Sequence, residues 1–143
     1  MKKILSYMLA ITITSMFVLP STVNAAPVLT RQKCKQTSTG RVCTIEKYMK
    51  ISVKYSYNDA KKIVARNNKL GSGNSQIIKY IVSLTPVTGL ASLMYDLGAT
   101  RCMNVFQTAV KKKTGVRFTY DYILNNNSIS LNKIENGRIT YEK

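Results

Sequence analysis

Three cysteines, Cys34, Cys43 and Cys102, are the residues best able to do covalent chemistry in this chain of 143 residues, which contains no histidine. The lack of histidine removes the commonest general base, the usual serine and cysteine triads, and most zinc sites. Cys102 shares one helical face with Val105 and Phe106, which predicts a small buried thiol rather than a nucleophile. Because the number of cysteines is odd, the alternative is a homodimer joined by a disulfide through Cys102.

The acidic residues form no catalytic or metal-binding pattern. There are only six of them, and they are scattered along the chain. A glycosidase needs two carboxylates held about 5–10 Å apart across a cleft, and no pair is marked out by its position. An all-protein calcium site needs more oxygen ligands in one place than these acids supply. We therefore expect a protein that is not an enzyme and that has no cofactor and no metal site.

Basic residues dominate the composition. The chain has 22 lysine and arginine residues against six acids, and a formal net charge of +16 at pH 7. Without the first 25 residues, which hold two of the lysines and none of the acids, the charge is +14. Such a charge attracts phospholipid headgroups, phosphate-bearing wall polymers and, without specificity, nucleic acid. The simpler interpretation is a solvated surface that keeps the protein soluble.

The order of residue types in residues 1–25 is typical of a secretory signal peptide of bacterial type. A short basic start is followed by an apolar run and then by small polar residues. The pattern predicts cleavage after Ala25, with Ala26 as the second choice. We therefore expect a secreted, extracellular protein in which residues 26–143 form one small domain.

Alternation of apolar and polar residues predicts a long β-hairpin over residues 28–57. If Cys34 faces Cys43, the register is fixed and Arg31 lies opposite Glu46. We expect these two cysteines to form a disulfide, which closes a short loop and contributes about 2–3 kcal/mol to stability.

This register gathers basic side chains on one face of the hairpin, beside a single acid. The predicted polyanion-binding residues are Arg31, Lys33, Lys35, Tyr48, Lys50 and Lys54. Tyr48 contributes an aromatic ring that can stack on sugars or bases. The simpler interpretation is that lysines on exposed strands block edge-to-edge aggregation.

Four helices are expected after the hairpin, at residues 57–70, 75–84, 86–97 and 100–113. Ser56 and Asp59 have the spacing of a capping box at the start of the first helix, and Gly71 stops it. Pro86 suits the first position of the third helix, and Gly115 is placed to close the fourth.

The second and third of these helices are apolar enough to be considered membrane-perturbing. The candidate residues are Ile77, Ile78, Ile81, Val82, Leu90 and Leu93. If the helices opened at an anionic bilayer, their apolar centre and cationic flanks would favour insertion. The simpler interpretation is that they cover the sheet, because a domain of this size needs that core.

The C-terminal part returns to strand, with alternating residues at 116–124, 129–134 and 138–141. Asn136-Gly137 is the strongest hairpin dipeptide and predicts a tight turn between the last two strands. The whole order predicts an α+β fold. In it, the N-terminal β-hairpin and a C-terminal three-stranded meander form an antiparallel sheet covered by about four central helices.

These observations lead us to expect a secreted, cationic, non-enzymatic protein that binds anionic membrane lipid or wall polymer of a cell envelope. In a membrane-active form it would be an antimicrobial, bacteriocin-like effector. The first alternative is a wall- or matrix-associated binding module without membrane activity. The second is a secreted inhibitor that presents the disulfide-closed loop with Arg41.

Overall fold

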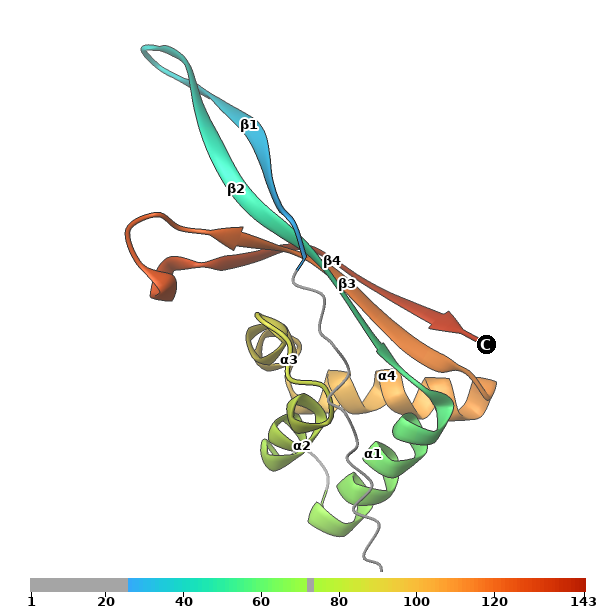
Figure 1. Ribbon diagram of the computed structural model, residues 1–143. Helices are drawn as coiled ribbons and strands as arrows, with labels where there is room; N and C mark the ends of the chain where they lie inside the picture. Colours follow the sequence, from blue (N-terminus) through green and yellow to red (C-terminus); the bar gives the residue numbers. More distant parts are fainter. Residues whose placement is uncertain (1–25, 72–73) are drawn as a thin grey trace, which may run out of the picture.

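The computed structural model describes residues 26–71 and 74–143, so the predicted signal peptide and the bond after Ala25 lie outside the described residues. The elements in chain order are β1 (Val28–Thr37), β2 (Gly40–Tyr55), α1 (Tyr57–Leu70), α2 (Gln76–Leu84), α3 (Leu90–Leu97), α4 (Ala99–Lys112), β3 (Gly115–Leu124), the 3₁₀ turn η1 (Ile129–Leu131) and β4 (Lys133–Glu142). The strands form one antiparallel sheet in the order β1-β2-β3-β4, with the helices on one side of it (Figure 1). The predicted α+β class is confirmed.

Alternate residues of β2 and β3 form the floor of the hydrophobic core, because successive side chains of a strand point to opposite faces. The buried residues of these strands on the helix side are Ile51, Val53, Tyr55, Val116, Phe118 and Tyr120. The Tyr55 ring packs edge-on against Phe106 of α4 and against Phe118, with centroid separations of 5.3 and 6.0 Å. The Tyr55 hydroxyl donates to the carbonyl oxygen of Ile81 at 3.0 Å, so its polar end is satisfied.

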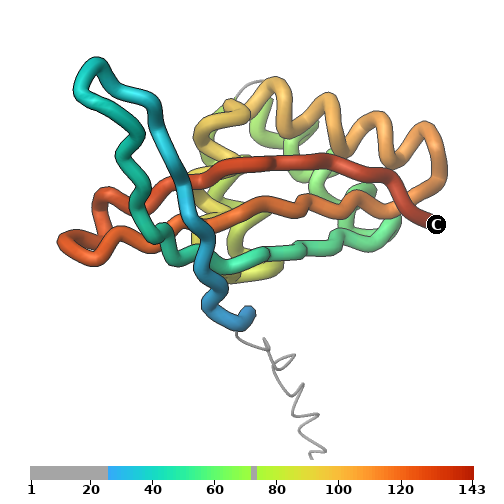
Figure 2. The backbone as a smooth tube through the Cα atoms, turned by 90° about the horizontal axis from the view of Figure 1, so that it is seen from above, coloured from blue at the N-terminus to red at the C-terminus, as the bar shows by residue number. Residues whose placement is uncertain are grey.

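The predicted hairpin register is confirmed residue for residue. Cys34 lies opposite Cys43 and forms a disulfide with it, and Arg31 lies opposite Glu46. The end of the β1–β2 hairpin extends beyond the helices (Figures 1 and 2). The alternation of this segment is therefore that of a strand, but the helices cover its apolar side only near the base. Ile45 in the outer part is 76% exposed.

The boundaries of the helices agree with the sequence in two places and differ in two. The capping box of Ser56 and Asp59 is present, and Gly71 ends α1. The third helix was expected at Pro86 but begins at Leu90, after Gly89. Gly89 has a φ of +78°, and a Cβ there would lie 2.6 Å from the ring of Tyr122, so only glycine fits this turn.

Gly115 does not close α4, as the sequence had predicted. Lys113 ends that helix in the left-handed conformation, and Gly115 is already the first residue of β3. A Cβ on Gly115 would lie 2.5 Å from the backbone oxygen of Tyr55. The glycine is needed because two strands approach closely at this point.

The predicted turn at Asn136-Gly137 is also wrong, because β4 runs without interruption from Lys133 to Glu142. The ladder shifts between Thr119/Arg138 and Asp121/Glu135, so two residues of β4 lie opposite Tyr120 alone. This is a β-bulge, and Asn136 supplies its positive φ of 55°. Within the described residues the C-terminal part therefore contributes two strands and a 3₁₀ turn rather than three strands.

Replacing Phe106 by alanine tests the packing of the sheet on the helices. Phe106 is fully buried between Tyr55 and Phe118, so Phe106→Ala should lower the free energy of unfolding by about 3–5 kcal/mol. Urea denaturation followed by circular dichroism measures the change. The exposed neighbour provides the control, and Gln107→Ala should stay within about 0.5 kcal/mol of the parent. Equal effects of the two changes would contradict this packing.

Candidate functional site

The sheet face opposite the helices, which we call the open face, carries the predicted polyanion-binding residues. Residues that pair across antiparallel strands share a face. Arg31 pairs with Glu46, and Tyr48, Lys50 and Lys54 follow Glu46 at even spacing along β2. The structure thus brings the six predicted residues to one face, Lys33 and Lys35 included.

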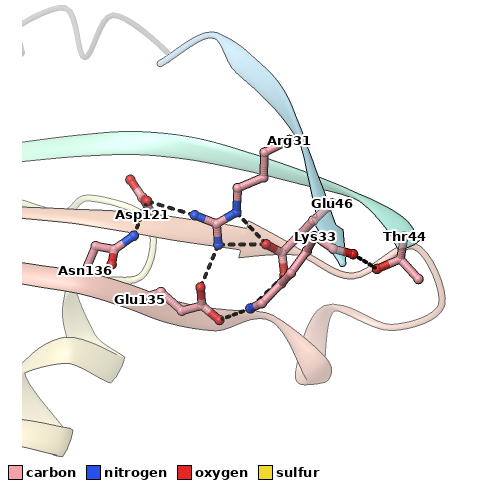
Figure 3. Close-up of polar contacts among 7 residues, drawn as sticks. All are labelled: Arg31, Lys33, Thr44, Glu46, Asp121, Glu135 and Asn136. Atoms are coloured by element: carbon pink, nitrogen blue, oxygen red, sulfur yellow. Dashed lines mark hydrogen bonds and ion pairs between the residues drawn. The ribbon is translucent and has the colours of Figure 1, made fainter. Parts of the chain in front are cut away.

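Arg31 lies at the centre of a group of acids from three strands (Figure 3). Its Nε donates to Oε2 of Glu46 on β2 at 2.7 Å, and its Nη1 to Oδ2 of Asp121 on β3 at 3.3 Å. Its Nη2 donates to Oε2 of Glu135 on β4 at 2.6 Å. We call Arg31, Lys33, Glu46, Asp121, Glu135 and Asn136 the Arg31 cluster. Sequence analysis placed only one of these acids, Glu46, beside Arg31.

The contact between Arg31 and Glu135 joins the two edge strands of a strongly coiled sheet (Figure 2). β1 and β4 are the two edge strands, and in a flat sheet they would lie roughly 14 Å apart, three strand spacings. Seen from above, the outer part of the β1–β2 hairpin instead crosses over β4 (Figure 2). The outer part of β1 must therefore bend over the open face toward β4, which makes that face concave.

The Arg31 cluster is extended by two more donors. Nζ of Lys33 donates to Oε1 of Glu135 at 3.0 Å, and Nδ2 of Asn136 donates to Oδ2 of Asp121 at 2.7 Å. The hydrogen bonds from Lys33 and then from Arg31 lower the pKa of Glu135 below its usual value. The bond to Glu46 contributes most to raising the pKa of Arg31. Both shifts favour the ionised forms and hence the ion pairs.

A second group of ion pairs lies at the other end of the open face. Arg117 donates to both carboxylate oxygens of Glu142, at 2.6 and 2.9 Å, and Lys54 lies 3.6 Å from the same carboxylate. Arg117 also donates to the hydroxyl of Ser52 at 2.9 Å. Acids of the C-terminal strands thus neutralise three of the predicted cations, namely Arg31, Lys33 and Lys54. Within the described parts of the chain, Lys35 and Lys50 have no ion-pair partner.

An open hollow of about 510 Å³ lies on the open face beside the β-bulge. Lys50 and Arg138 line it together with Ser52, Thr119, Asp121 and Asn136. Sequence analysis did not connect Arg138 with Lys50, because the assumed turn at Asn136-Gly137 put the last residues in the wrong register. Alternation of apolar and polar residues on both sides of a bulge in β4 was the sequence signal that would have placed Arg138 beside Lys50.

The helical part of the chain carries the same net charge, +7, as residues 26–56 and 115–143 together, but among the described residues its cations lack acid partners. Residues 57–114 hold nine lysine and arginine residues and only two acids. Asp59 is occupied by its capping box with Ser56, and Asp96 is exposed. None of these nine cations forms an ion pair within residues 26–71 and 74–143, whereas four acids are engaged on the open face.

A groove of about 410 Å³ lies between α1 and α2 within this positive part. Arg66 and Lys79 line it with Gln76, Tyr80 and Ser83, and the guanidinium of Arg66 lies 5.9 Å from the centre of the Tyr80 ring. No acid lines the groove. Two cations, an amide and the Tyr80 hydroxyl can together bind a phosphate or sulfate group, whereas the Ser83 hydroxyl already donates to the carbonyl oxygen of Tyr80.

The predicted membrane-perturbing side chains lie in the core of the folded chain. Ile77, Ile78, Ile81, Leu90 and Leu93 are buried, and Val82 is half-buried. No helix in the described part of the chain is long and apolar enough to cross a membrane. The folded protein therefore buries these residues in its core, and membrane insertion by α2 and α3 would require that the core open first.

Cys102 is buried in the same core and unpaired with any other cysteine. Its Sγ lies 3.5 Å from the carbonyl oxygen of Met94, and burial raises the pKa of the thiol to about 11. The folded chain thus does not present this sulfur to solvent. A dimer through Cys102 stays a prediction, and it too would require the core to open. No group of three His, Cys, Asp or Glu side chains in the described ranges is arranged to hold a metal ion.

The Arg31 cluster should hold the outer part of β1 against β4. Replacing Arg31 by glutamine leaves three carboxylates near one another without their shared cation. We expect Arg31→Gln to lower the free energy of unfolding by about 1–2 kcal/mol, a modest value because solvent reaches the cluster. Amide hydrogen exchange should become faster in β1. Lys35→Gln on the same strand is the matched control, and the prediction fails if it has the same effect.

The lowered pKa of Glu135 predicts a pH dependence of stability. A carboxylate whose pKa is lower in the folded than in the unfolded chain stabilises the fold above its unfolded pKa, and the contribution is lost as the pH falls through the folded pKa. Glu135→Gln should therefore reduce the loss of stability on acidification below about pH 4.5. Urea denaturation at a series of pH values measures it. Lys33→Gln should likewise reduce the loss of stability on acidification. Parallel curves of unfolding free energy against pH for the parent and both variants would refute the assignment of this loss to Glu135.

No protein-family model, no curated protein and no solved structure matches the chain. The function has to be argued from the chain's own charges, hollows and exposed surfaces.

Proposed function

We propose that the protein is a secreted, non-enzymatic module that binds phosphate-bearing anionic material of a cell envelope, either wall polymer or lipid headgroups. The binding is driven by charge and leaves the helical core folded. The proposal combines the strong positive charge of the sequence with the uneven placement of its few acids in the fold.

The observation that carries the proposal is the set of nine helical cations without acid partners. On the open face, acids of β3 and β4 form ion pairs with several cations, so the positive charges of these paired cations are largely neutralised within the molecule. The positive charges of the helical part are not neutralised by neighbouring carboxylates in the described residues, so they can attract an anion from solution. An extended polyanion gains most where cations are numerous, exposed and free of competing carboxylates.

The groove between α1 and α2 is the best-defined anion site on that positive surface. Arg66 and Lys79 come from two different helices, and their charges converge on one hollow. Arginine binds phosphate through its planar fork of donors, and lysine adds a compact point charge. A phosphodiester polymer that lies across the helices would place one phosphate in this groove.

Binding by the folded protein is favoured over membrane damage because the apolar side chains of α2 and α3 lie in the core. Opening α2 and α3 would expose fully buried side chains such as Ile77, Ile81 and Leu90. A cationic surface on the intact fold needs no such rearrangement. We therefore favour the binding module over the membrane-damaging effector.

An inhibitor is the second candidate, and the disulfide is the observation that favours it. The Cys34–Cys43 bond closes a short loop, and Arg41 within it is exposed. Arg41 lies opposite Gln36 in the β1–β2 ladder, so it would be offered to a protease from a rigid hairpin.

Binding to a purified phosphodiester wall polymer should depend strongly on salt and on the unpaired helical cations. The protein to use is the chain from residue 26 onward, which contains every strand and helix that the structure describes. Between about 50 and 200 mM salt, the affinity measured by isothermal titration calorimetry should fall at least about tenfold. The triple variant Arg66→Gln/Lys69→Gln/Lys79→Gln should weaken binding further at every salt concentration.

A second triple variant with the same loss of charge is the control. Lys33→Gln/Lys54→Gln/Arg117→Gln removes three cations that already have acid partners, and it should weaken binding less. Equal losses would mean that net charge alone acts and that the helical surface is not the site. No binding at low salt, or binding that does not change with salt, would refute the proposed function.

A further inference from the structure

Half of the exposed large apolar side chains in the described part of the chain, namely Val42, Ile45, Ile129 and Leu131, lie in the outer part of the β1–β2 hairpin or in η1, whereas Val28 and Leu29 lie at the start of β1. Ile129 and Ile45 are the most exposed of all, at 84% and 76%. A concentration of this kind marks an interaction site more often than scattered surface residues do.

The fold brings two distant segments together to make this surface. Ile45 on β2 and Leu131 on η1 line the same hollow of about 270 Å³. Asn125, Asn126 and Asn127, from the loop between β3 and η1, also line it. The hairpin and the β3–η1 loop both extend to the same side, beyond the helices (Figures 1 and 2). We call Ile45, Ile129 and Leu131, together with the cations Arg41 and Lys47 of β2 and Lys133 of β4, the hairpin-end surface.

The charged residues of the hairpin-end surface are all cations, and they are exposed and unpaired in the described part of the chain. Arg41, Lys47 and Lys133 are exposed, and none of them has an ion-pair partner in residues 26–71 or 74–143. The nearest acids, Glu46 and Glu135, are already held by Arg31 and Lys33. The Arg31 cluster thus leaves this end of the protein with aliphatic side chains flanked by free cations.

This combination fits an anionic bilayer better than a second copy or a folded protein. A second copy would bring the same three cations face to face. A folded partner needs about 800 Å² of complementary surface, whereas here single aliphatic side chains project around one small hollow. Aliphatic side chains enter the boundary between headgroups and acyl chains one by one, and neighbouring cations pair with lipid phosphates.

We propose that the hairpin-end surface docks on an anionic lipid bilayer, with Ile45, Ile129 and Leu131 in the headgroup–acyl boundary and Arg41, Lys47 and Lys133 at the phosphates. This inference goes beyond the proposed function, because it assigns a second anion-binding surface, separate from the groove between α1 and α2, and commits it to lipid. The protein lies on the membrane and keeps its helices folded, so the contact differs from insertion of α2 and α3.

A single tryptophan tests the depth of the contact, because the chain contains none. In the chain from residue 26 onward, the emission of Ile45→Trp should shift to the blue on phosphatidylglycerol vesicles at physiological salt. Tyr95→Trp, at an exposed position of α3, should show no shift. Emission that shifts equally at both positions, or at neither, would overturn the proposal.

Affinity provides the second arm of the test. Ile45→Ser/Leu131→Ser should weaken sedimentation with these vesicles at least about tenfold, since two exposed aliphatic side chains no longer leave water. The matched variant Leu84→Ser/Tyr95→Ser removes exposed apolar groups from the helices and should bind as the parent does. Because all four positions are exposed, circular dichroism should show unchanged folding.

The outcomes separate this inference from the proposed function. Salt-sensitive binding to phosphodiester wall polymer without binding to vesicles would overturn the bilayer contact and leave the proposed function standing. Loss of binding to both would overturn both. A blue shift of Ile45→Trp without lipid, together with a doubled mass in solution, would overturn the bilayer in favour of a second copy.

Discussion

The arrangement of the open face and of the hairpin depends on one guanidinium group. Arg31 reaches carboxylates on β2, β3 and β4 from the far edge of the sheet. Arginine can do this because its donors point in several fixed directions in one plane, whereas a lysine offers a single compact head. The contact links β1 to β4 across the concave side of the coiled sheet. Beyond this contact, the hairpin end projects from the helical body (Figure 1).

The same cluster holds three of the six acids on the open face, away from the cations of the helices. Four of the six acids lie on the open face, where they pair with cations of β1, β2 and β3. The helices receive none of this compensation within the described residues, so their nine cations are unpaired, whereas more than half of the cations on the open face are paired with acids. The proposed polyanion surface follows from this division, and so do the free cations at the hairpin end.

The apolar residues are divided in a comparable way. Those of α2 and α3 lie in the hydrophobic core, where they pack with side chains of α1, α4 and the apolar face of the sheet. Those of the outer hairpin and η1 remain at the surface, because the hairpin is longer than the helical layer beneath it. A membrane contact through the second group leaves the fold intact, whereas one through the first group would destroy it.

The sequence by itself determined the local features of this protein. The hairpin register from Cys34 and Cys43, the capping box at Ser56 and the α+β order all follow from spacing within short segments, and the structure agrees with each of them. Only the tertiary structure decided that Asn136-Gly137 is a bulge, that Arg31 meets Glu135, and that Ile45 is uncovered. The physical reason is that alternation tells which side chains share a face of a strand. What lies against that face depends on how far the sheet coils and where the helices end, and both are set by contacts between residues distant in the chain.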